Sequence, residues 1–157
     1  MIVGTANPPL NQARLREIVQ GIAASEHEWL SVVRYDLDRR WYQRLTWDDD
    51  HEVWLLSWMP GQRTGFHDHG SSAGAFTVAR GALRERTAPR HRPGPSIAVP
   101  RGQVRSFGPW YIHDVMNTSV QPALSVHAYS PPLTSMRRFD FGPGGLECVT
   151  METAGRW

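Results

Sequence analysis

The sequence predicts an all-β fold, a small jelly-roll β-barrel with a short N-terminal helical lobe. Beyond about residue 40, the segments are short, rich in β-branched and aromatic residues, and separated by Gly, Pro, Asp or Ser. About ten such strands in a chain of 157 residues are typical of antiparallel sheets that close on themselves. We therefore expect a single domain, with residues 1–40 as a helical segment packed on a barrel of residues 41–157.

The expected elements follow from the periodicity of apolar residues. Residues 11–24 repeat apolar side chains at helical spacing, and Asn11 is a suitable N-cap. A shorter helical turn is expected over residues 26–33. The expected strands are residues 41–47, 52–58, 74–80, 83–87, 96–99, 104–107, 112–116, 124–129, 137–141 and 146–150. The proline-rich residues 87–95 are expected to form an exposed loop.

Composition excludes several classes of function. The formal net charge is +2 and the basic residues are scattered, which does not favour nucleic-acid binding. No apolar run approaches the roughly 18 residues of a membrane span. The single cysteine, Cys148, cannot form an internal disulfide, and we expect it to be a small buried hydrophobe. These features predict a cytoplasmic protein.

A histidine pair stands in the glycine-rich stretch from Gly61 to Gly81. In a β-strand, His67 and His69 would point to the same side and Asp68 to the other, where it would be a supporting or surface residue. Two imidazoles at this spacing suit iron, zinc, copper or nickel. The remaining ligands must therefore identify the metal.

The motifs around this pair carry a family resemblance. The stretch with Gly61, His67, His69 and Gly81 resembles the first metal motif of the cupin superfamily. A later set of residues resembles the second metal motif of the superfamily: Gly94, Pro100, Gly102, His113 and Asn117. The run SerValHisAlaTyrSerProPro, residues 125–132, is similar to the cysteine dioxygenase family of thiol dioxygenases. The resemblance covers roughly residues 41–141 and implies a cupin fold.

The resemblance implies that His67, His69 and His113 hold iron(II). The general cupin pattern has a carboxylate ligand where this chain has Gly74. Three neutral histidines leave several metal sites open for substrate and dioxygen, and a thiolate substrate would bring the missing negative charge. A closed structural zinc site would require a fourth protein ligand. Gly74 also excludes the cysteine–tyrosine crosslink of mammalian-type members, which would involve Tyr129.

Ser125, His127 and Tyr129 alternate along one predicted strand and therefore share a face. In the family this trio is a catalytic network, in which the tyrosine hydroxyl meets substrate and bound oxygen, the histidine holds the tyrosine, and the serine holds the histidine. The alternative is an ordinary strand with a polar face toward solvent.

Arg44 is the candidate for binding the substrate carboxylate, because a guanidinium can form a bidentate pair with it. The family has an arginine near this point with a tyrosine two residues earlier, which Tyr42 and Arg44 resemble. Gln43 is the alternative, because relatives that act on 3-mercaptopropionate use a glutamine there. The family's pocket cysteine after SerProPro falls here at about Ser135 or Met136.

These features predict a dioxygenase that oxidises L-cysteine with dioxygen to cysteine sulfinic acid. A different thiol carboxylate, such as 3-mercaptopropionate, is the first alternative. A non-catalytic cupin sensor and an isomerase-type cupin with zinc or manganese are further alternatives. The expected partners are a small thiol and dioxygen, with no nucleic acid and no membrane, and we expect a monomer. No organic cofactor is expected, since no nucleotide-binding glycine motif occurs.

Overall fold

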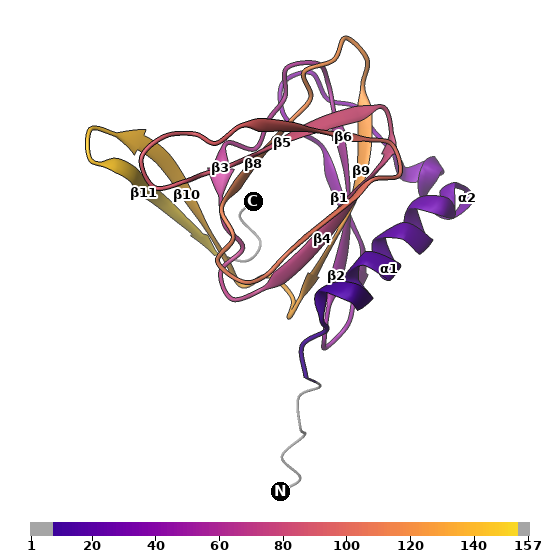
Figure 1. Cartoon of the computed structure of the whole chain (residues 1–157). Coiled ribbons are helices and arrows are strands. Elements are labelled where there is room, and N and C mark those ends of the chain that lie inside the picture. Colours follow the sequence, from indigo (N-terminus) through magenta and orange to yellow (C-terminus); the bar gives the residue numbers. More distant parts are fainter. Residues whose placement is uncertain (1–7, 154–157) are drawn as a thin grey trace, which may run out of the picture.

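The structure is a computed structural model that describes residues 8–153 (Figure 1). Its N-terminal part holds α1 (Gln12–Ala24), α2 (Glu26–Trp29) and a short 3-10 helix, η1 (Leu30–Val32). The side chain of Asn11 caps α1 by accepting a hydrogen bond of 2.9 Å from the backbone N–H of Arg14. The predicted helix and its cap are confirmed.

The described chain contains eleven strands, one more than the sequence predicts. The additional strand is β3, which is only two residues long and carries His67. The strands are β1 (Tyr42–Trp47), β2 (Glu52–Trp58), β3 (Phe66–His67), β4 (Ala73–Arg80), β5 (Ala82–Thr87), β6 (Ser96–Pro100), β7 (Val104–Phe107), β8 (His113–Met116), β9 (Ala123–Ser130), β10 (Ser135–Gly142) and β11 (Gly145–Thr153).

The strands form two antiparallel sheets that face each other as a barrel (Figure 1). One sheet has the order β1-β2-β9-β4-β7 and the other β11-β10-β3-β8-β5-β6. This arrangement confirms the predicted all-β barrel, preceded in the sequence by a short helical segment. The division into a segment of residues 1–40 and a barrel of residues 41–157 stays a prediction. The first seven residues of that segment and the last four of that barrel, residues 1–7 and 154–157, lie outside the described residues.

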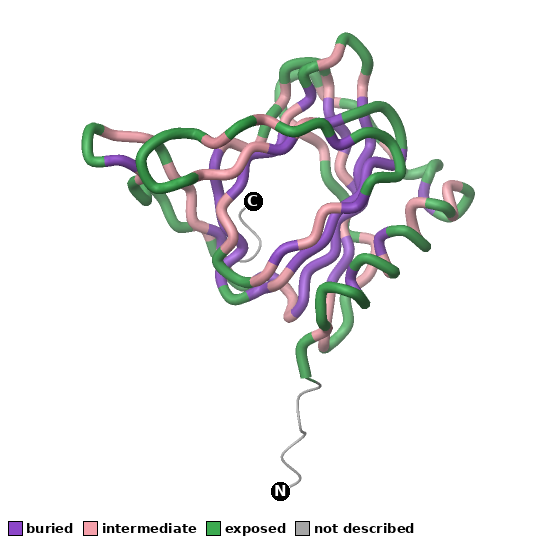
Figure 2. The backbone as a smooth tube through the Cα atoms, viewed as in Figure 1, coloured by how far each residue is buried: buried purple, intermediate pink, exposed green. Residues whose placement is uncertain are grey.

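Helix α1 covers the outer face of the first sheet, where Leu15 and Val19 are fully buried against the strands. Strand β9 is therefore enclosed on both faces, and all eight of its residues are buried (Figure 2). Leu124, Val126 and Ala128 join the cluster under α1, so the alternate residues face the barrel interior. Because α1 covers the outward-facing apolar side chains of β9, this strand can carry polar side chains on its inner face without exposing apolar ones to solvent.

The hairpin of β10 and β11 lies at the side of the barrel away from α1 (Figure 1). Among the described strands, β11 pairs only with β10, and most of its residues are exposed. Cys148 lies on this edge strand and is exposed, so the expectation of a buried cysteine is wrong. An edge strand lacks the second neighbour that would have covered it. None of the described helices is long and apolar enough to cross a membrane.

Candidate metal centre and active site

Three buried histidines meet inside the barrel. His67 ends β3 and lies opposite His113, the first residue of β8, in the register of the second sheet. His69 follows two residues after His67, and each of the three side chains is at most 5% exposed. One nitrogen from each ring lies within 4.8 Å of the others. The structure thus brings together the three residues that the sequence selects.

Hydrogen bonds fix the tautomers of two of these rings. Nδ1 of His67 lies 2.9 Å from the carbonyl oxygen of Gly65, and Nδ1 of His113 lies 2.8 Å from Oε1 of Glu85. A carbonyl and a carboxylate only accept, so each Nδ1 carries the proton and each Nε2 presents a lone pair. Burial, and then the neighbouring histidines, hold the pKa values of His67 and His69 well below the usual value. The rings of His67 and His69 are therefore neutral at physiological pH.

This donor set fits a divalent metal ion. The Nε2 atoms of His67 and His69 are 3.1 Å apart. Two nitrogens bound to one ion at ~2.1 Å and at right angles are separated by ~3.0 Å. No Asp, Glu or Cys within the described residues joins the three-histidine group, so a bound ion would keep open positions.

The local backbone differs from the expected strand. Strand β3 ends at His67, and His69 lies in the turn that follows. Asp68 points away from the histidine group and is fully buried, so the surface alternative is excluded. Its carboxylate accepts hydrogen bonds from Nε of Arg137 at 2.8 Å and from the backbone N–H of Gly70 at 3.2 Å. These bonds hold the turn that directs His69 toward His67.

Packing explains why the residue in the place of the missing carboxylate, Gly74, is a glycine. A Cβ atom at this position would lie 2.5 Å from the ring of Phe107 and 3.0 Å from Tyr129. The Phe107 ring is stacked on His69, with centroids 5.1 Å apart, and on Tyr111 at 5.0 Å. The space of a fourth ligand is therefore filled by an aromatic ring.

Ser125, His127 and Tyr129 form a row along the inner face of β9. Oγ of Ser125 lies 2.8 Å from Nε2 of His127, and Nδ1 of His127 lies 3.4 Å from the hydroxyl of Tyr129. All three side chains are buried, so the alternative of a solvent-exposed polar face is wrong. The Tyr129 ring packs on His69 with centroids 4.6 Å apart. The row thus ends beside the histidine group.

Burial determines the charge state of this row. It is the main cause that lowers the pKa of His127 to about 3, with a contribution from His113. Burial, and then the nearby charge of Glu52, raise the pKa of Tyr129 above its usual value. His127 is therefore a neutral imidazole and Tyr129 keeps its hydroxyl proton across the physiological pH range.

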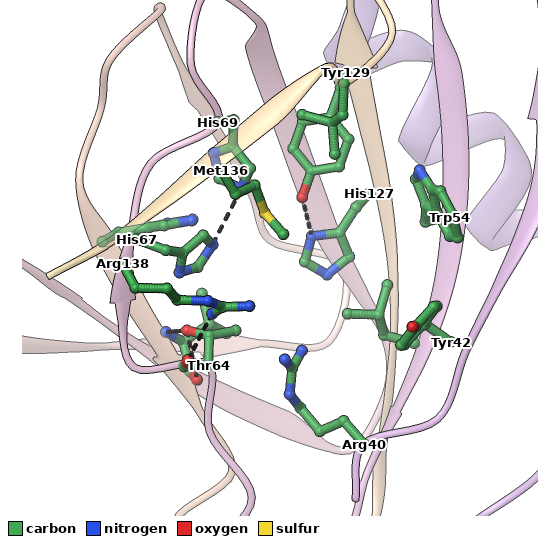
Figure 3. A pocket seen from close by; sticks show the side chains of 14 residues that line it. Arg40, Tyr42, Trp54, Thr64, His67, His69, His127, Tyr129, Met136 and Arg138 are labelled. Carbon is green, nitrogen blue, oxygen red and sulfur yellow. Dashed lines mark hydrogen bonds between the residues drawn. The ribbon is translucent and has the colours of Figure 1, made fainter. Parts of the chain in front are cut away.

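A pocket leads to the histidines and to Tyr129 (Figure 3). It combines apolar walls with two arginines, and none of the described acidic side chains lines it. Its lining residues are Arg40, Tyr42, Trp54, Leu56, Thr64, His67, His69, His113, Val115, His127, Tyr129, Leu133, Met136 and Arg138. The expected pocket position after SerProPro is thus occupied by Met136.

The structure places Arg44 and Gln43 outside this pocket. The Arg44 guanidinium packs over Trp47 and Trp54, at 4.7 and 5.4 Å, and lies 3.5 Å from the carboxylate of Glu52. The amide of Gln43 donates to the carbonyl oxygen of Arg44. Tyr42 does line the pocket. Of the expected substrate pair, only the tyrosine reaches the site.

Arg40 is the pocket arginine that sequence reasoning missed. Together with Tyr42 and Arg44 it follows a two-residue alternation, which was the available signal, but it precedes β1 and is the last residue of the segment 1–40 that the sequence assigns to the helical part. No carboxylate of the described residues lies within ion-pair distance of Arg40, whose guanidinium packs 5.0 Å from the ring of Trp58. Burial, and then Arg138, lower its pKa to about 10, so Arg40 remains a cation.

Arg138 extends into the same pocket from another side (Figure 3). Its guanidinium is already engaged: one nitrogen donates to the carbonyl oxygen of Thr64 at 3.0 Å, and another lies 3.1 Å from Glu152. Arg138 therefore contributes positive potential, whereas Arg40 has hydrogen-bond donors free for an anion.

Comparison with known proteins agrees with this site. Residues 10–141 match the family model described as cysteine dioxygenase type I. The chain is 28% identical to cysteine dioxygenase type 1 of Danio rerio over 155 residues, which covers 90% of this chain and 76% of the relative. It is 27% identical to the Homo sapiens enzyme of the same name over 158 residues, covering 93% and 78%.

Solved structures support the fold. A Klebsiella pneumoniae protein with a double-stranded β-helix domain aligns with a TM-score of 0.59 and 20% identity, covering 80% of this chain and 95% of that one. A cupin superfamily protein of Desulfitobacterium hafniense aligns with a TM-score of 0.54 and 12% identity, covering 64% and 84%. The barrel is thus a cupin, and the family match covers its histidine group, its Ser-His-Tyr row and its pocket. The chain belongs to the cysteine dioxygenase type I family and is a dioxygenase.

Proposed function

We propose that this protein binds iron(II) through His67, His69 and His113 and oxidises L-cysteine with dioxygen to cysteine sulfinic acid. The observation that carries the proposal is the site itself: three buried imidazoles without a carboxylate in the group lie beside a protonated tyrosine and a cationic pocket. When bound, iron(II) would supply Lewis acidity and the electrons for oxygen activation.

The chain's own residues would position the reactants. Arg40 would hold the substrate carboxylate, because it is a half-buried cation without a carboxylate partner among the described residues. The apolar walls, including Trp54, Leu133 and Met136, would exclude water and strengthen that ion pair. Tyr129 would donate its hydroxyl proton to an oxygen or sulfur atom of the reactants, while His127 holds the phenol in place.

A second substrate, 3-mercaptopropionate, is favoured by one observation. Within residues 8–153, two arginines and no acidic side chain line the pocket, so a substrate ammonium group would have no anionic partner there. L-Cysteine would therefore have to enter with its amine neutral, as a metal ligand. A thiol carboxylate without an amine avoids that requirement.

The test is oxygen consumption by the anaerobically iron-loaded protein with L-cysteine, cysteamine, 3-mercaptopropionate and mercaptosuccinate side by side. Sulfinate is detected by mass, as a product heavier by two oxygen atoms. Fastest turnover of L-cysteine supports the first proposal, and fastest turnover of 3-mercaptopropionate supports the second. Turnover of cysteamine at the same rate as L-cysteine would contradict carboxylate binding by Arg40.

We also propose a cytoplasmic location. The single cysteine, Cys148, is exposed, and an exposed free thiol persists in a reducing compartment. Fluorescence of the tagged chain in its host checks this proposal.

A further inference from the structure

Glu85 is a fully buried carboxylate on β5 that touches the histidine group from behind. Its Oε1 atom lies 2.8 Å from Nδ1 of His113 and 3.3 Å from the hydroxyl of Tyr111. Its Oε2 atom accepts a hydrogen bond of 2.5 Å from Nε of Arg105 on β7. Glu85 lies 28 positions before His113 in the chain, and the pairing of β5 with β8 brings them together.

The three histidines have different partners on their outer nitrogens. Nδ1 of His67 donates to a neutral carbonyl, that of Gly65. Nδ1 of His113 donates to a carboxylate. Nδ1 of His69 is buried and has no hydrogen-bond partner within the described residues. The three imidazoles therefore cannot be equivalent as ligands, and His113 should be the strongest electron donor.

The effect of the Glu85 charge on the metal depends on the absence of a carboxylate among the three proposed ligands. A carboxylate that accepts the Nδ1 proton of an imidazole increases the electron density on Nε2, and it does so most effectively in a buried, low-dielectric site. Gly74 occupies the place of a direct carboxylate ligand, and the Phe107 ring fills the space beside it. A negative charge can then reach the metal only through a ligand or from the substrate.

We propose that Glu85 is a positioning residue that supplies this charge through His113, so that it strengthens metal binding and lowers the reduction potential of the bound iron. The inference rests on the proposed metal site and goes beyond it by assigning a role to a residue that touches neither metal nor substrate. Arg105 binds the other oxygen of the same carboxylate and is partly exposed. Arg105 therefore withdraws negative charge from Glu85 and opposes its effect on His113.

Because Glu85 and Arg105 act on His113 in opposite directions, substitutions of the two residues should shift the reduction potential with opposite signs. Glu85→Gln keeps an acceptor for His113 but removes the charge, whereas Arg105→Gln leaves the charge less neutralised. Fe(II) affinity is measured anaerobically by competition with a chromogenic chelator, and the Fe(III)/Fe(II) reduction potential by redox titration. We expect Glu85→Gln to weaken Fe(II) binding by about tenfold or more and to shift the potential to more positive values. We expect Arg105→Gln to shift the potential to more negative values without loss of affinity.

A merely structural ion pair would give a different result, because both substitutions would then weaken binding together. Asp114→Asn is the matched control: it removes another fully buried carboxylate, beside His113 in sequence, whose ion pairs are with Arg63 and Arg86. We expect it to shift the potential less than Glu85→Gln does. Wild-type affinity and potential in Glu85→Gln, or shifts of the same sign in both variants, would overturn the proposal.

Three further outcomes are distinguishable. If Glu85→Gln fails to fold, as judged by circular dichroism, the negative shift in Arg105→Gln still decides the question. If the wild-type chain binds Fe(II) but oxidises none of the four thiols, the proposed activity fails while the role of Glu85 remains measurable. If the wild-type chain binds no Fe(II), both the metal site and this inference are refuted.

Discussion

Trp58 and Ser125 are joined by a buried hydrogen bond in which the indole Nε1–H donates to Oγ over 2.8 Å. The indole can only donate, so Ser125 accepts there. Among the described residues, Nε2 of His127 at 2.8 Å is the one remaining partner of this hydroxyl, so we assign the Ser125 proton to that hydrogen bond. Nδ1 of His127 then carries the ring proton and donates toward the Tyr129 oxygen at 3.4 Å. The Tyr129 proton is thereby left for an acceptor in the pocket.

Replacing Trp58 with Phe tests this direction. Without the indole donor, Ser125 loses the hydrogen bond that it accepts and gains by accepting one from His127 instead, so we expect the Nε2–H tautomer of His127 to become more populated. Because one hydrogen bond in the row is lost, we expect kcat to fall by about tenfold. Nitrogen-15 NMR of labelled histidine distinguishes the tautomers. Trp29→Phe is the control, since it removes a buried indole donor to the carbonyl oxygen of Ile22 under α1. An unchanged His127 tautomer in Trp58→Phe would contradict the assigned direction.

The histidine group predicts loss of metal on single substitution. Changing His67, His69 or His113 to Ala removes one of three nitrogen donors, and we expect bound iron and activity to disappear together. Iron per chain is measured after anaerobic loading and desalting. His51→Ala is the control, because His51 lies outside the group and pairs with Asp50. A variant that retains iron removes its residue from the set of ligands.

Arg40 and Arg44 give opposite expectations for substrate binding. Arg40→Gln removes a charged hydrogen bond to the substrate carboxylate, and we expect KM to rise at least about tenfold with iron still bound. Arg44→Gln removes a partly exposed guanidinium that lies 3.5 Å from the buried carboxylate of Glu52 but does not line the pocket, so it should leave KM within about threefold. Steady-state kinetics of both variants decide between the positions. A large effect of Arg44→Gln alone would return the carboxylate site to the arginine that the sequence indicated.

Gly74→Ala tests the packing that replaces the fourth ligand. The added Cβ would meet the Phe107 ring, which is stacked on His69, so we expect a loss of about 1–3 kcal/mol in the free energy of unfolding. Gly21→Ala is the matched control: it lies inside α1 with no atom within 4 Å of the new Cβ. It should stabilise the protein by about 0.5–1 kcal/mol. Chemical denaturation measures both, and equal effects would argue against a crowded site at Gly74.

Burial of neutral His127 predicts acid sensitivity. Its pKa is lowered to about 3 in the folded protein, so the unfolded chain binds a proton at higher pH than the folded chain does. The free energy of unfolding therefore falls as the pH decreases from about 6.5 toward 3. Urea unfolding of the metal-free protein at about pH 5 and about pH 7 measures the difference. We expect His127→Gln to reduce this pH dependence, and an equal slope in both proteins would contradict a buried neutral histidine.

The sequence alone determined the features that depend on local spacing. The helical repeat of residues 11–24 and the alternation of Ser125, His127 and Tyr129 both follow from backbone geometry. A strand must place alternate residues on one face whatever surrounds it. For this reason most of the barrel and the inner face of β9 could be predicted without coordinates.

The tertiary structure decided what depends on neighbours distant in sequence. Arg40, rather than Arg44, enters the pocket because Trp47, Trp54 and Glu52 hold the Arg44 guanidinium elsewhere. Cys148 is exposed because β11 is an edge strand. The contact between Glu85 and His113 exists only through the pairing of β5 with β8. Spacing fixes the side of a strand from which a side chain projects, but the partner that it meets there is fixed by packing between segments remote in the chain.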